Sequence, residues 1–420
     1  MAPPLQSQLA MNFGTLVFLF VTIVFSLPSL AEEIKEWDQP EILGEGDEFI
    51  RSLEEMDLRD LRSGSVFQEP WSGYLWPMDK MGPLQRYNDK KFPITATVQS
   101  YFSYLEQNPP TKYFSEGAEA INKLSPLEKF ELLTLDMNFP MTKSALGLLK
   151  SKTFNDGTIP SWYGFCDGLA AASIIFPRPK HSINVTAIDK KTKIHFLPED
   201  LKAIATYYMS SFGMRNRLEV GAQCRTQQPK RGSTGRPEPY ECNDINPASF
   251  HMAVVNRVGL HRRHLILEAD AGYPEWNHPI INYKYEFFNP VTKSITRLKK
   301  AGVAPEEYSK DPFKSVRSTN TAKIVGVHMK ILKSDFHSAA DDVETDSPER
   351  DSRITIIYDC TLELDKQGQI IGGEWDNPLD DRARPDFIWA LPTKNFKPAN
   401  SPQEFALYNR IESLFALANE

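Results

Sequence analysis

Residues 161–176 decide the fold, and their sequence is Ser161-Trp162-Tyr163-Gly164-Phe165-Cys166-Asp167-Gly168-Leu169-Ala170-Ala171-Ala172-Ser173-Ile174-Ile175-Phe176. An aromatic, glycine-rich loop leads into a run of small apolar residues that is typical of a tightly packed helix, and Cys166 stands at its start. Free amide N–H groups and the helix dipole favour a thiolate at such a position. We therefore expect Cys166 to be a nucleophile. The alternative is a buried structural thiol, because unpaired cysteines often pack as small hydrophobic residues.

Two later segments supply candidate partners for this thiol. The segment 250–256, Phe-His-Met-Ala-Val-Val-Asn, is interpreted as a strand that His251 opens, and 265–270, Leu-Ile-Leu-Glu-Ala-Asp, as the next strand. A cysteine on a helix, then a histidine, then an acid is the chain order of papain-like and transglutaminase-like enzymes. Glu268 and Asp270 share one face of the second strand, so either acid can face the histidine. We prefer Asp270 as the orienting acid because it closes the strand.

The composition indicates a globular chain. It has 420 residues, of which 41% are hydrophobic and 11% aromatic, and this length suggests two or three domains. The formal net charge is only −7, and no block of lysine or arginine stands out. Nucleic-acid binding therefore has no support from composition.

The first 31 residues indicate export. They contain no charged side chain, include the apolar run 13–25, and end in Ser29-Leu30-Ala31 before Glu32. This pattern is typical of a secretory signal peptide, and the run is short for a membrane span, which needs about 20 residues. We expect a secreted protein, or a periplasmic one in a bacterium, with no stable membrane anchor after cleavage.

The four cysteines divide into one pair and two free thiols. Cys224 and Cys242 flank a polar loop rich in proline, glycine and basic residues, which an exported protein would close with a disulfide. Cys360 lies in an alternating apolar strand and is expected to be a packed thiol. Cys166 is left unpaired, as a nucleophile requires.

The remaining pattern predicts an α+β fold with four regions. After the signal peptide at 1–31 come an aromatic-rich N-terminal arm at 32–93, a catalytic core at 94–300 and a β-rich region at 301–420. Helices are predicted within 102–152, at 198–212 and at 403–418, and strands at 251–258, 264–268, 280–288, 322–331, 353–364 and 369–375. The acidic run 341–351 lacks the spacing of a calcium loop and is interpreted as a solvated loop.

Several short motifs together resemble the secreted transglutaminase elicitor family of plant-pathogenic oomycetes and some bacteria. They lie in the family's order between about residues 70 and 390, and they are Pro70-Trp71-Ser72-Gly73, Trp76-Pro77, Arg86-Tyr87, Leu124-Ser125-Pro126-Leu127-Glu128-Lys129, Trp162-Tyr163-Gly164-Phe165-Cys166-Asp167-Gly168, Phe250-His251 with Asn256, Trp276-Asn277-His278-Pro279-Ile280, Gly372-Gly373-Glu374-Trp375 and Pro385-Asp386-Phe387-Ile388-Trp389.

This resemblance implies a papain-like core and a protein-glutamine γ-glutamyltransferase that joins protein glutamine to lysine or other amines. It also implies calcium as a supporting ion, and no organic cofactor. His278 stands where the family usually has glutamine. Papain-like proteases carry a glutamine six residues before the cysteine to hold the oxyanion, whereas this chain has Pro160. Backbone amides around Cys166, with Trp162 nearby, are then expected to serve instead.

The expected mechanism has Cys166 as nucleophile, His251 as general acid and base, and Asp270 as the group that orients the imidazole. Two alternatives stay open. A papain-like cysteine peptidase or amidase uses the same thioester and resolves it with water. A secreted binding or elicitor protein would keep the site without catalysis.

Overall fold

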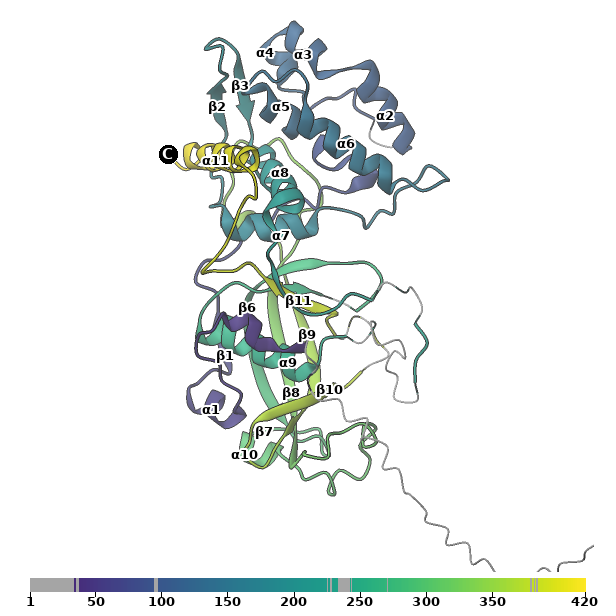
Figure 1. Ribbon diagram of the computed structural model, residues 1–420, viewed down its shortest axis with the longest axis vertical. Helices are drawn as coiled ribbons and strands as arrows, with labels where there is room; N and C mark the ends of the chain where they lie inside the picture. Colours follow the sequence, from purple (N-terminus) through teal and green to yellow (C-terminus); the bar gives the residue numbers. More distant parts are fainter. Residues whose placement is uncertain are drawn as a thin grey trace, which may run out of the picture.

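The computed structural model describes residues 34, 38–93, 97–224, 226, 229–232, 242, 244–269, 271–377, 380, 382 and 384–420. The predicted signal peptide and Asp270 lie outside these residues. Along its long axis the molecule has a helical lobe and a sheet lobe (Figure 1). Within the described ranges, no helix combines the length and apolar character that a bilayer span requires.

The helical lobe surrounds one hydrophobic core. Its elements are α2 (Val98–Gln107), α3 (Pro110–Glu116), α4 (Ala118–Ile121), α5 (Pro126–Leu132), α6 (Pro140–Lys152), α7 (Cys166–Ile175), α8 (Pro198–Tyr208), the C-terminal α11 (Pro402–Leu417), and the hairpin of β2 (Ile183–Thr186) with β3 (Lys193–Phe196). The helices predicted in this part of the sequence are confirmed. The Ser125 hydroxyl and the Glu128 carboxylate form the capping box expected at the start of α5.

The sheet lobe is built on one antiparallel sheet. The strand order is β10 (Ile370–Trp375), β9 (Arg353–Leu364), β8 (Lys323–Ser334), β6 (Asn277–Phe288), β5 (Ile266–Glu268), β11 (Phe387–Ala390) and β4 (Leu218–Gly221), with β1 (Ser63–Ser65) and β7 (Ile295–Thr296) also paired to β6. The short helices α1 (Leu53–Leu58) and α10 (Leu298–Ala301) belong to the same lobe (Figure 1). The predicted α+β class is confirmed. One sheet joins the regions predicted at 94–300 and 301–420, since β6 pairs with β8.

The strand predicted at residues 251–258 is wrong. This segment is helical, as α9 (Pro247–Ala253) followed by a π-helical segment at Val254–Leu260. Asn246 caps the helix by accepting a hydrogen bond from the Ala248 amide at 2.9 Å, and Pro247 occupies the first turn. The whole of α9 is buried against the sheet, in the second hydrophobic core. Tertiary burial therefore outweighs the strand preference of Val254, Val255 and Val258 in the π-helical segment that follows.

The disulfide and the two free thiols agree with the sequence analysis. Cys224 is bonded to Cys242. Cys166 and Cys360 are both free and buried, and Cys360 lies in β9 within the second core. The predicted separation into one crosslink and two reduced thiols is confirmed.

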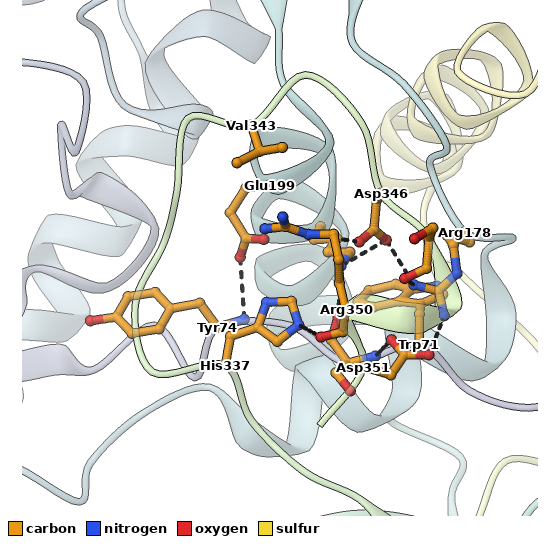
Figure 2. A network of polar contacts seen from close by, with 12 residues as sticks. Trp71, Tyr74, Arg178, Glu199, His337, Val343, Asp346, Arg350 and Asp351 are labelled. Carbon is orange, nitrogen blue, oxygen red and sulfur yellow. Dashed lines mark hydrogen bonds and ion pairs between the residues drawn. The ribbon is translucent and has the colours of Figure 1, made fainter. Parts of the chain in front are cut away.

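The loop between β8 and β9 crosses from the sheet lobe to the helical lobe, where it forms a buried polar network (Figure 2). Asp346 is 7% exposed and contacts Arg178 at 2.9 Å and Lys202 at 3.0 Å. The backbone of the same loop donates from Asp346 to the Lys180 carbonyl at 2.8 Å and from His337 to the Gly73 carbonyl at 2.7 Å. The interpretation of residues 341–351 as only a solvated loop is therefore incomplete.

Candidate active site

Cys166 is the first residue of α7, where that helix meets the sheet lobe. α7 packs on α8 so closely that a Cβ on Gly168 would lie 2.2 Å from the Thr206 carbonyl oxygen. Only glycine permits this approach. The preceding residue Phe165 donates its backbone N–H to the Leu75 carbonyl at 3.1 Å, which fixes the loop before the helix. The sequence 164–168 thus places the thiol at a helix start on a rigid base.

The Cys166 sulfur faces the first residues of β6. The Asn277 side-chain amide lies 3.6 Å from Sγ, and the Glu275 carbonyl oxygen lies 3.7 Å from it. Trp389, on β11, donates its indole N–H to Asn277 Oδ1 at 2.7 Å. The thiol therefore lies between the start of α7 and the start of β6, and β11 holds the Asn277 side chain through Trp389.

The thiol of Cys166 is protonated at neutral pH. Burial raises its pKa to about 12, and the negative charge of Asp167 acts in the same direction. The backbone and side-chain N–H groups of Asn277 oppose this rise, because they stabilise the thiolate. Any reaction of this thiol must therefore include the transfer of its proton.

A cavity of about 730 Å³ opens beside Cys166. Its lining is rich in aromatic side chains: Trp162, Tyr163, Tyr207, Phe212 and Tyr273. Asp167, Glu275 and Lys152 also line it. A cavity of this size and character suits a side chain carrying a polar end group.

His251 is not at this cavity. It lies in α9 in the second core, 1% exposed, with its ring edge-to-face on Tyr285 at a centroid distance of 4.7 Å. Burial lowers its pKa to about 3. All eight histidines of the chain fall within the described residues, and none of them lines the cavity. The structure therefore does not bring Cys166 and His251 together.

The two candidate acids have different outcomes. Asp270 lies outside the described residues, so its predicted role stays a prediction. Glu268 ends β5, is 1% exposed, and accepts a hydrogen bond from the Trp276 backbone amide at 2.9 Å. This contact holds the chain just before Asn277. Glu268 thus supports the wall of the site through the backbone.

Among the described residues, no cluster of three or more histidine, cysteine or acidic side chains could hold a metal ion. The calcium ion implied by the resemblance therefore has no such cluster in the part of the chain that the structure describes.

Sequence reasoning missed Asn277 and Trp389. Both occur in motifs of the family resemblance, Trp276-Asn277-His278-Pro279-Ile280 and Phe387-Ile388-Trp389. The motifs carry no sign that these side chains meet, because 112 residues separate them. The only usable signal was the presence of polar and aromatic residues in otherwise apolar strand segments.

Comparisons with known proteins point in one direction. The sequence model of a family described as transglutaminase elicitor matches residues 45–419. The crystal structure of the GP42 transglutaminase from Phytophthora sojae aligns with 92% of this chain and 99% of its own, at a TM-score of 0.57 and 18% sequence identity. At that identity the likeness concerns the fold. No curated protein matches the chain.

Proposed function

Because the chain belongs to the transglutaminase elicitor family, we propose that it is a secreted protein-glutamine γ-glutamyltransferase with Cys166 as its nucleophile. One observation carries the proposal: a free thiol at the start of a helix faces an aromatic cavity of about 730 Å³. A helix-borne cysteine opposite strand ends also fits the papain-like core expected from the sequence. The disulfide between Cys224 and Cys242 supports an oxidising, extracellular location.

The reaction has two acyl-transfer steps. The Cys166 sulfur attacks the side-chain carboxamide carbon of a protein glutamine, the C–N bond breaks, and ammonia leaves with the proton that the thiol gave up. The ε-amine of a protein lysine then attacks the thioester carbonyl. An isopeptide bond forms, the C–S bond breaks, and the sulfur regains a proton.

Proton transfer is the step that the geometry constrains most. Asp167 and Glu275 line the cavity with Cys166, and we propose that one of these two carboxylates accepts the thiol proton. Burial raises the pKa of Asp167, which makes its carboxylate a stronger base than an exposed one. The aromatic lining limits access of water to a thioester and so favours an amine over hydrolysis.

A second candidate is a binding protein that does not turn over substrate. The observation that favours it is the neutral, buried thiol, with no imidazole at the described cavity. Under this alternative the aromatic cavity would bind a side chain without reaction. The two candidates differ in whether Cys166 forms a covalent bond.

The test uses the mature chain from Glu32, a glutamine-rich protein and a fluorescent primary amine, with and without calcium. We expect fluorescence to enter the acceptor protein covalently, and Cys166→Ser to abolish this while circular dichroism stays unchanged, because a hydroxyl is far less ionised than a thiol. Release of ammonia or cleavage of the acceptor without amine incorporation would indicate a hydrolase. Absence of all three reactions, with or without calcium, would favour the binding protein.

A further inference from the structure

The side-chain amide of Asn277 points at the Cys166 sulfur. Its nitrogen lies 3.6 Å from Cys166 Sγ, and the N–H groups of Asn277 act to lower the pKa of this thiol. Asn277 is 1% exposed. A buried donor aimed at a nucleophile interacts with little competition from water.

Trp389 determines which end of the Asn277 amide faces the sulfur. An indole N–H can only donate a hydrogen bond, so the group that meets it must be an acceptor. The Trp389 indole nitrogen lies 2.7 Å from Asn277 Oδ1, and Trp389 is fully buried. The oxygen of the amide is thus occupied, and its NH₂ group is left to face Cys166.

Strand pairing holds both side chains in place. Asn277 is paired with Glu268 across β5 and β6, and Trp389 is paired with Ile266 across β5 and β11. The Glu268 carboxylate also binds the backbone amide of Trp276, directly before Asn277. A donor supported in this way needs little reorganisation when charge develops near it.

We propose that Asn277 is a catalytic residue that donates hydrogen bonds to the Cys166 thiolate and then to the oxyanion, and that Trp389 is the positioning residue that orients its amide. This inference rests on the proposed acyl transfer. When the sulfur attacks the carboxamide carbon, the C=O π electrons move to oxygen, and the new oxyanion lies within reach of groups that surround the sulfur. Asn277 thereby fills, from the strand side, the place that Pro160 leaves without a side-chain donor.

The central variant is Asn277→Leu, which keeps a similar volume and removes the donor amide. We expect kcat for amine incorporation to fall about 100- to 1,000-fold, as for loss of an oxyanion donor, with KM within about twofold. Alkylation of Cys166 by iodoacetamide at pH 8 should slow about tenfold, which corresponds to a pKa rise of about one unit. Peptide mass spectrometry measures this rate, with buried Cys360 in the other core as an internal reference that should not change.

Trp389→Phe is the second variant, since it keeps a buried aromatic ring and removes only the indole N–H. We expect smaller decreases in kcat and in the Cys166 alkylation rate, because the Asn277 amide remains but is free to rotate its oxygen towards the sulfur. Thermal unfolding tests whether each variant is folded. If Asn277→Leu does not fold, the rates of Trp389→Phe alone test the proposal. Unchanged kcat and unchanged Cys166 alkylation in a folded variant would overturn the proposal.

The alkylation rates separate this inference from the proposed function. Suppose that the wild type incorporates no amine, but that Cys166 is alkylated more slowly in both variants than in the wild type. The donor role of Asn277 would then stand, and the transferase activity would be refuted. Normal transferase activity in both variants would support the proposed function and refute the donor role of Asn277.

Discussion

At the scale of single residues, His251 is a buried weak base in an apolar environment. Neither ring nitrogen has a hydrogen-bond partner among the described residues, and burial lowers the pKa of the imidazole to about 3. An unfolded chain takes up this proton near pH 6.5. The stability that neutral His251 contributes is therefore present above pH 6.5 and is lost as the pH falls towards 3.

We therefore predict that His251→Leu, a substitution of similar volume, retains amine incorporation and resists acid better than the wild type. The difference in unfolding free energy should grow as the pH is lowered from 6.5, by at most about 1.4 kcal/mol per pH unit. Urea unfolding at several pH values measures it. A folded variant that loses nearly all activity would instead restore the catalytic role first expected for His251.

Residue-scale chemistry was predictable from sequence where it depended on local context. The place of Cys166 at the start of a helix was predicted from its loop and helix, and the pairing of Cys224 with Cys242 from the polar loop between them. The contact between Asn277 and Trp389 was not predictable, because it depends on β5 pairing with both β6 and β11, and these two strands are far apart in the sequence.

At the scale of elements, α7 owes its position to the absence of a side chain at Gly168. We predict that Gly168→Ala pushes α7 away from α8, because its Cβ would meet the Thr206 carbonyl at 2.2 Å and Ser210 Cβ at 2.7 Å. The cost should be about 1–3 kcal/mol, as for other overpacked sites. The alkylation rate of Cys166 should also change, because this residue is at the start of the displaced helix. Chemical denaturation and alkylation kinetics measure the two effects.

Gly147 in α6 provides the matched control. A Cβ there would have nothing within 4 Å, so Gly147→Ala should stabilise the protein by about 0.5–1 kcal/mol through its helix preference. Equal effects of the two substitutions would mean that helix preference, and not the α7–α8 contact, governs position 168.

Element type was predictable where local signals agreed, as in α5 with its capping box and in β9, whose predicted limits match. It failed at residues 251–258 because a short buried apolar run fits either a helix or a strand. The cap by Asn246 and Pro247 was the signal that could have decided it.

At the scale of the whole molecule, the loop between β8 and β9 ties the lobes together through buried charges. The sequence could not predict this connection, because Asp346 of the acidic run 341–351 pairs with Arg178 and Lys202, which lie in the other lobe. Lys202 also donates to the Ser72 carbonyl at 2.7 Å and lies over the Trp71 ring at 5.3 Å. Asp346 is thus the shared anion of a buried cluster (Figure 2).

Removing that anion should loosen the molecule between its lobes. Asp346→Asn keeps the shape of the side chain but leaves the buried Lys202 and the partly buried Arg178 with less compensation, so we expect a loss of about 3–5 kcal/mol, as when one partner of a buried ion pair is removed. Asp342→Asn changes an exposed acid of the same loop and should cost less than about 0.5 kcal/mol. Denaturant unfolding measures both, and limited proteolysis should cut the loop faster only in Asp346→Asn. If the two variants unfold alike and are cut alike, the buried cluster does not hold the loop, and backbone pairing such as that of His337 with Gly73 must do so alone.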